Sequence, residues 1–377
     1  MVKTTVKTVT LLLIVILATS SASAFIRPEF SMPQRGLNSY NSACVYWSLP
    51  DNLACPKPLP LNEMVHGIAT WGDLIYAIGT NGSLFCLAKD GRIIFAVRVP
   101  EKPIGIPLID SEHAYVMTSK GIMIAFDRVS GEEDWRIKLA ERGSCDITRY
   151  GNTAVTCSPN QIHCINITNG LRKWNADVTG SQAPLSVSIL SNRVMVNHLS
   201  GIMCIDLVDG TVLWQHEVER RSEKMAYVNI PVIHYDRVFI PDSDGILYCF
   251  GLYDGEVIWS RDLEGIPRAP VTTDGGRLWI PIGNRIVCMN VVNGDTIWDE
   301  KVADWVLMTQ LIKSGDRLYG AGQMDGIHVV SATDGAVIDT LPFTTGTGQE
   351  LCVGGDYLTA VNVGAKNYLY IFGPSAR

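Results

Sequence analysis

The stretch Met-Cys-Ile-Asp-Leu-Val-Asp-Gly-Thr-Val-Leu-Trp, residues 203–214, decides the fold of this chain because related copies recur along the sequence. In five copies a tryptophan follows a glycine by four residues, and with two degenerate copies successive glycines lie 40, 39, 40, 45, 39 and 41 residues apart. A period near 40 residues predicts an array of similar structural units. The pairs are Gly131 and Trp135, Gly170 and Trp174, Gly210 and Trp214, Gly255 and Trp259, and Gly294 and Trp298, with degenerate copies at Gly91 and Gly335.

Each unit has the pattern of four short β-strands. In residues 230–263, apolar runs alternate with turn sequences such as Asp242-Ser243-Asp244-Gly245 and Tyr253-Asp254-Gly255. Strands joined by Asx-Gly turns form an antiparallel meander. A single meander cannot bury both faces, so the copies must pack on one another, and about 40 residues in four strands is the size of a propeller blade. Glycine or proline interrupts nearly every 11-residue window, which excludes a helical solenoid.

The two ends of the repeat region predict how the array closes. Seven glycine-centred units are visible, and residues 349–372 hold three more strand-like runs that lack a fourth. Residues 44–49, which contain Trp47, have the pattern of a lone outer strand before the first unit. We therefore predict an all-β, eight-bladed propeller of four-stranded antiparallel blades, in which residues 44–49 complete the C-terminal blade. Closure of this kind removes free sheet edges.

The first 24 residues differ from the repeats. Lys3 and Lys7 precede an apolar run that ends in Ala22-Ser23-Ala24, a pattern typical of a secretory signal peptide. We expect residues 1–24 to be removed and residues 25–377 to form one domain in the periplasm or outside the cell, with retention of the segment as an uncleaved anchor as the alternative. No other hydrophobic stretch has membrane length, so we expect no membrane span after cleavage.

Composition restricts the partners. The 377 residues include 31 Lys and Arg against 38 Asp and Glu, a formal net charge of -7, with no long block of basic residues. A nucleic-acid partner is therefore disfavoured. Hydrophobic residues make up 47% of the chain, enough for a large core. We expect a monomer.

The repeat resembles the blade motif of the pyrroloquinoline-quinone-type propeller family, in the pattern apolar-x-Asx-x-x-Asx/Ser-Gly-x-x-x-Trp. The motif begins at Ala125-Phe126-Asp127, Cys164-Ile165-Asn166, Cys204-Ile205-Asp206 and Cys288-Met289-Asn290, and the resemblance covers residues 44–372. The Gly-His and Trp-Asp signatures of WD40 repeats, another propeller family of similar period, do not stand at the required places. The resemblance implies that outer-strand tryptophans dock between neighbouring blades, namely Trp47, Trp135, Trp174, Trp214, Trp259 and Trp298.

The same repeat occurs in quinoprotein dehydrogenases and in non-catalytic proteins such as BamB, a scaffold subunit of the outer-membrane β-barrel assembly machinery. The dehydrogenases carry two adjacent cysteines beside the quinone and a Ca²⁺ site, whereas none of the ten cysteines here adjoins another. We therefore expect a BamB-like scaffold that binds proteins of an envelope assembly complex, without catalytic residues, cofactor or metal site. The alternatives are a quinone-dependent oxidoreductase, with Arg268 in the central channel, and a carbohydrate-binding surface protein.

Two features outside the repeat register are candidates for partner binding. The 45-residue spacing between Gly210 and Gly255 contains a charged insertion, in which Arg220, Arg221, Glu223 and Lys224 are the candidate contacts; a solvated loop is the alternative. Trp305 lies just beyond a last strand, where it either contacts a partner or packs on a neighbouring blade.

The cysteines suggest two disulfides and a set of core residues. Cys44 and Cys55 flank a short N-terminal segment, and Cys145 and Cys157 flank a hairpin whose register would pair them if its loop has three residues. A loop of two residues would break that pairing. Most of the other cysteines stand six residues before a blade glycine and are expected to be apolar core residues: Cys164, Cys204, Cys249 and Cys288.

Overall fold

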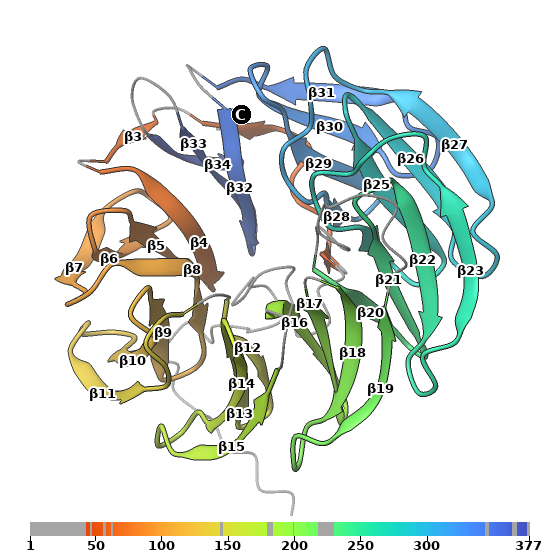
Figure 1. Ribbon diagram of the computed structural model, residues 1–377. Helices are drawn as coiled ribbons and strands as arrows, with labels where there is room; N and C mark the ends of the chain where they lie inside the picture. Colours follow the sequence, from red (N-terminus) through yellow and green to blue (C-terminus); the bar gives the residue numbers. More distant parts are fainter. Residues whose placement is uncertain are drawn as a thin grey trace, which may run out of the picture.

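Eight small sheets form a closed ring around a central axis, with their inner strands at the centre and their outer strands on the perimeter (Figure 1). This computed structural model describes residues 43–374, apart from 46, 56–57, 62, 144–145, 179–183, 199, 218–229, 344–346 and 364–367. The predicted all-β, eight-bladed propeller is confirmed. No helix among the described residues is long and apolar enough to cross a membrane.

Each blade takes its strands in chain order from the centre outward. Blade 1 has β4 (Val65–Trp71), β5 (Leu74–Gly79), β6 (Ser83–Ala88) and β7 (Ile93–Arg98); blade 2 has β8 (Pro103–Ile109), β9 (His113–Thr118), β10 (Ile122–Asp127) and β11 (Glu133–Lys138). Blade 3 has β12 (Thr148–Tyr150), β13 (Thr153–Ser158), β14 (Gln161–Asn166) and β15 (Arg172–Asp177); blade 4 has β16 (Pro184–Leu190), β17 (Arg193–His198), β18 (Gly201–Asp206) and β19 (Val212–Glu217). Blade 5 has β20 (Val232–His234), β21 (Arg237–Pro241), β22 (Ile246–Gly251) and β23 (Val257–Asp262); blade 6 has β24 (Thr272–Thr273), β25 (Arg277–Ile282), β26 (Arg285–Asn290) and β27 (Thr296–Lys301). Blade 7 has β28 (Ile312–Ser314), β29 (Arg317–Ala321), β30 (Ile327–Ser331) and β31 (Val337–Leu341), and blade 8 has β32 (Thr347–Gly354), β33 (Tyr357–Val363) and β34 (Tyr368–Pro374).

The repeated sequence motif forms the turn between the third and fourth strands. In blade 2, Oδ1 of Asp127 accepts hydrogen bonds from the backbone N–H groups of Val129 (3.0 Å) and Ser130 (2.7 Å). Gly131 then donates to the carbonyl of Asp127 at 2.9 Å and has a φ of 75°, which favours glycine. One turn geometry therefore explains the glycine and, in blades 2, 3, 4 and 6, the Asp or Asn four residues before it.

The ring is closed by residues that precede blade 1, as predicted, but the strands differ from those predicted. β2 (Leu53–Ala54) and β3 (Leu59–Pro60) pair antiparallel with β34 and so complete blade 8. β1 (Cys44–Val45) instead pairs parallel with β28 of blade 7. The assignment of residues 44–49 to the outer edge of the C-terminal blade is therefore corrected to two short strands within residues 53–60, which tryptophan spacing could not reveal because neither contains a tryptophan.

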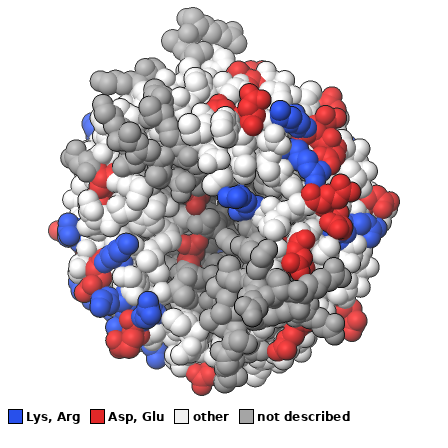
Figure 2. Space-filling model, turned by 45° about the horizontal axis from the view of Figure 1, so that its top comes forward, with Lys and Arg blue, Asp and Glu red and all other residues white. Residues whose placement is uncertain are grey.

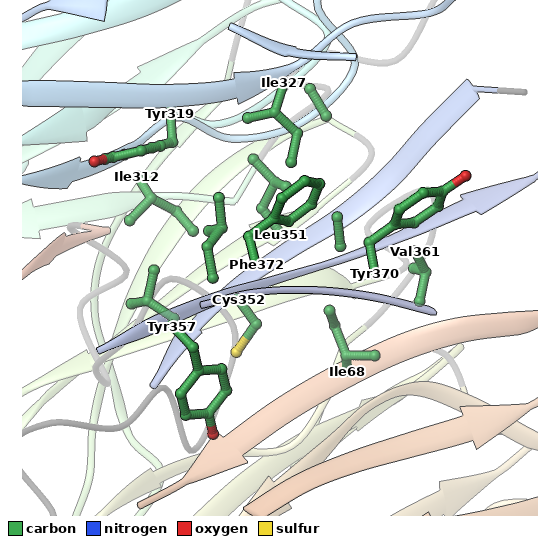
Figure 3. Close-up of a cluster of buried hydrophobic side chains, with 14 of the residues drawn as sticks. Ile68, Ile312, Tyr319, Ile327, Leu351, Cys352, Tyr357, Val361, Tyr370 and Phe372 are labelled. Atoms are coloured by element: carbon green, nitrogen blue, oxygen red, sulfur yellow. The ribbon is translucent and has the colours of Figure 1, made fainter. Parts of the chain in front are cut away.

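A hydrophobic cluster joins the first and last parts of the ring. It combines Ile68 of β4, Ile312 and Tyr319 of blade 7, and Leu351 and Phe372 of blade 8, all buried (Figure 3). Tyr357 of blade 8 donates a hydrogen bond to the carbonyl of Gly72 in blade 1 at 2.8 Å. Apolar burial and this hydrogen bond therefore hold the closure together.

Candidate functional site

The tryptophans of the outer strands lie against the turn glycine of the following blade. A Cβ built on Gly170 would lie 2.7 Å from Cε3 of Trp135, and one built on Gly255 would lie 2.5 Å from Cε3 of Trp214. The indole N–H of Trp214 donates to the carbonyl of Leu252 in the same neighbouring blade at 3.0 Å. The corresponding contacts are Trp174 with Gly210, Trp259 with Gly294 and Trp298 with Gly335.

Trp47 does not take this place at the closure. A Cβ on Gly91 of blade 1 would lie 2.7 Å from Cδ1 of Leu59 in β3, so Leu59 occupies the position that tryptophan has elsewhere. The backbone carbonyl of Trp47 instead accepts a hydrogen bond from the Ser314 hydroxyl of blade 7 at 2.7 Å. The predicted docking role of Trp47 is therefore corrected, because the chain first runs along blade 7 and only later reaches the edge of blade 8.

Hydroxyl groups on the inner strands bind neighbouring blades together. Thr70 of blade 1 donates to the carbonyl of Val353 in blade 8 at 2.6 Å, and Thr148 of blade 3 donates to that of Val187 in blade 4 at 3.1 Å. These side chains are almost fully buried. They serve packing between blades rather than a ligand in the channel.

The described residues do not fit a bound pyrroloquinoline quinone. The sequence lacks two adjacent cysteines, and no group of three or more His, Cys, Asp or Glu within the described part of the chain is placed to hold a metal ion. Arg268, the proposed quinone contact, is exposed in the loop between β23 and β24. A quinone bound to the described residues would therefore have neither adjacent cysteines nor such a metal-binding group beside it.

The repeated cysteines are buried core residues. Cys164, Cys204, Cys249 and Cys288 are free thiols and fully buried on the third strands of their blades. Burial raises the pKa of Cys204 and of Cys249 to about 12. Because the thiolate is the reactive form, these groups are unsuited to nucleophilic or redox chemistry at neutral pH.

Neither predicted disulfide gains support from the structure. Cys44 is a buried free thiol, so the predicted Cys44–Cys55 bond is absent; β1 lies on blade 7, whereas Cys55 follows the strand on blade 8. The hairpin between β12 and β13 pairs Tyr150 with Thr153, which leaves a two-residue loop. The register required to pair Cys157 with Cys145 is therefore absent, although Cys145 itself lies outside the described residues.

The loops fall on two faces because the four strands of each blade alternate in direction. Connections from one blade to the next share a face, here called the loop face, with the turns between second and third strands. Viewed obliquely, the molecule is hollowed at its centre, and acidic and basic side chains both lie at the edge of the hollow (Figure 2). The charged insertion with Arg220, Arg221, Glu223 and Lys224 lies outside the described residues.

Trp305 lies on the loop face between β27 and β28, with 53% of its surface exposed. Its backbone is nevertheless held in place: the N–H groups of Asp304 and Trp305 donate to Oδ2 of Asp325 at 3.2 and 3.3 Å. Leu307, which is buried, forms a bridge with Gly322. The loop is thus fixed on the hairpin of blade 7 while the indole faces solvent.

Sequence reasoning missed the residues that support Trp305. Oδ2 of Asp325 also lies 3.0 Å from Nε2 of the buried His328, and Met324 next to Asp325 is 61% exposed. The sequence Met-Asp-Gly at 324–326 predicts a hairpin turn, but not that its carboxylate would reach another loop. Trp305 and Met324 are therefore exposed apolar side chains on two loops that are hydrogen-bonded to each other.

Comparison with known proteins places the fold in a family. A family model described as outer membrane protein assembly factor BamB matches residues 45–260 and 199–376. The BamB of Moranella endobia is 19% identical over 255 residues, covering 61% of this chain and 64% of that protein. This chain therefore spans less than two thirds of that relative's length.

The same architecture occurs in solved structures of BamB and of a dehydrogenase. BamB from Moraxella catarrhalis superposes with a TM-score of 0.68 at 17% identity, covering 84% of this chain and 99% of that one. A europium-containing methanol dehydrogenase superposes with a TM-score of 0.78 at 10% identity, covering 92% and 98%, and shares the fold alone. On the family model's match along nearly all of the described residues, the chain belongs to the pyrroloquinoline-quinone-like repeat propeller family described as outer membrane protein assembly factor BamB.

Proposed function

We propose that the protein is an exported, non-catalytic scaffold that binds other proteins of the cell envelope, as the name of its BamB relatives suggests. The observation that carries this proposal is Trp305, an exposed tryptophan on a backbone fixed by Asp325. Tryptophan is enriched at the energetic centres of interfaces, and a rigid backbone lowers the entropy lost on binding.

The proposal assigns roles to the N-terminal segment, to the propeller domain and to the charged insertion. Residues 1–24 would direct export, and residues 25–377 would act as one propeller domain in the periplasm or at the cell surface. The charged insertion with Arg220, Arg221, Glu223 and Lys224 would add contacts to the partner. The partner would be a subunit of the outer-membrane β-barrel assembly machinery.

A matched pair of variants tests the role of Trp305. We expect Trp305→Ser to weaken binding of the full chain to assembly-machinery subunits by at least about 30-fold, the effect of losing ~2 kcal/mol at an interface centre. The control is Tyr235→Ser, which removes an aromatic side chain that is 76% exposed on the opposite face. Affinity is measured by surface plasmon resonance on purified subunits. Equal affinity of both variants and the unchanged protein would count against the proposal.

A further inference from the structure

The outer wall of blades 4 to 7 carries a row of exposed apolar side chains. The strands concerned, β19, β23, β27 and β31, are the last strands of their sheets and run along the perimeter (Figure 1). The side chains stand at the start of each outer strand and in the turn before it, and each is 41–74% exposed. This outer apolar band consists of Val208, Val212, Leu213, Tyr253, Val257, Ile258, Val292, Ile297, Val337 and Ile338.

Apolar residues are not required at the two outer-strand positions, although Ile93 and Ile94 hold them in blade 1 and Val129 is exposed at the turn position of blade 2. Blade 2 has Glu133 and Asp134, and blade 3 has Arg172 and Lys173, at the two places that Val257 and Ile258 occupy in blade 5. These strands have the same bulge and the same following tryptophan. The apolar side chains of the band therefore need an explanation other than blade packing, since exposed apolar patches favour association.

Contacts between blades join each outer strand to the turn of the next blade. The guanidinium of Arg261 in β23 donates to the carbonyl of Asn293 in the turn of blade 6 at 2.6 Å. Trp214 and Trp259 each lie against the turn glycine of the next blade. Each outer strand thus borders the turn that carries the next apolar side chains, such as Val292 beside Asn293.

The surroundings of the band are strongly acidic. Two arginines of neighbouring strands also reach the band: Arg193 lies 5.7 Å from the centre of the Tyr253 ring, and Arg237 donates to the carbonyl of Val292 at 2.7 Å. The two basic residues of the outer strands and turns themselves have acidic partners: Arg261 lies 3.4 Å from Asp295, and Lys301 lies 3.7 Å from Asp304. Most of the acidic residues are exposed, and they outnumber these two bases. In the four outer strands and their turns they are Asp206, Asp209, Glu217, Asp254, Glu256, Asp262, Asp295, Asp299, Glu300, Asp334 and Asp339.

We propose that the outer apolar band binds an amphipathic helix of a partner protein whose apolar face is flanked by Lys and Arg. Apolar side chains of the helix would cover the band, and its cations would meet the surrounding carboxylates. The bulge in each outer strand disfavours addition of a partner strand at the edge, so a helix is the occupant that fits. The inference rests on the proposed scaffold function and adds a second surface and the chemistry of its partner.

The test uses the full chain and an amphipathic peptide of Leu and Lys, about 18 residues or five helical turns long. The variant is V257S/I258S/V337S/I338S. The matched control is I93S/I94S, because Ile93 and Ile94 hold the same repeat positions in blade 1 but stand among Lys89, Arg92 and Arg98. We expect the band variant to bind the peptide at least about tenfold more weakly, a change of ~1.4 kcal/mol, and the control to bind it unchanged.

Three outcomes would overturn the inference. One is equal peptide affinity in the band variant and the unchanged protein, with thermal melts showing both folded. The second is equal binding of a peptide in which Glu replaces Lys. The third is binding to phosphatidylglycerol vesicles through the same residues, which would make the surface a membrane contact. If the band variant keeps its peptide affinity while Trp305→Ser loses the assembly subunits, the inference fails and the proposed function stands.

Discussion

At the scale of single residues, two separate constraints favour glycine in the turn of a repeat: the backbone conformation and the lack of space for a Cβ. Gly255 has a φ of 73°, and a Cβ there would also meet the ring of Trp214 at 2.5 Å. Gly283 has a φ of 59° but has no atom of another residue within 4 Å of a built Cβ. The pair therefore separates the cost of backbone conformation from the cost of crowding the docked tryptophan.

We expect Gly283→Ala to lower the free energy of unfolding by about 1–2 kcal/mol, the cost of a left-handed conformation. Gly255→Ala should cost about 1–3 kcal/mol more, because overpacking against Trp214 is added. Urea unfolding followed by fluorescence measures both. Equal losses in the two variants would show that the tryptophan does not press on the glycine as described.

The recurring residues could be predicted from sequence because each performs the same local task in every blade. The Asx residue and glycine form one turn, and the tryptophan fills one gap between blades. Trp305 could be singled out because it breaks this register. Its support by Asp325 could not, because that hydrogen bond joins loops 20 residues apart whose approach depends on the packing of blades 6 and 7.

At the scale of elements, the closure is where sequence patterning failed. β2 and β3 have only two residues each and are surrounded by prolines. Segments this short have no alternation of polar and apolar residues that would predict a strand. Proline is nevertheless compatible with an edge strand, which is the place of Pro60 in β3. The prediction that residues 44–49 close the ring relied on Trp47, which is a tryptophan like the docking residues but does not occupy their position.

The contact between Leu59 and Gly91 at the ring closure predicts that substitutions at positions 59 and 60 differ in their effect on the free energy of unfolding. Leu59→Ala should lower the free energy of unfolding by about 1–2 kcal/mol, because half-buried Leu59 covers Gly91 of blade 1. Pro60→Ala, at the next and exposed position, should change it by less than about 0.5 kcal/mol. Denaturant titration of both variants measures this. If the two changes are equal, β3 does not close the ring through Leu59.

At the scale of the whole molecule, the same architecture carries both BamB proteins and quinone-dependent enzymes, so the fold cannot assign the function. In this chain, inner-strand hydroxyls are engaged between blades and the repeated cysteines are buried thiols. Within the described part of the chain, two surface features are exposed to other molecules: Trp305 on the loop face and the outer apolar band on the wall of blades 4 to 7. This arrangement suits a scaffold with more than one partner surface.

The most direct test of that account is photo-crosslinking in cells, with a photoreactive amino acid at position 305 and, as the control, at position 235 on the opposite face. We predict that position 305 crosslinks to a subunit of the outer-membrane β-barrel assembly machinery, identified by mass spectrometry, and that position 235 does not. Crosslinks from position 305 that contain no assembly subunit, or equal yields of such crosslinks from the two positions, would contradict the account.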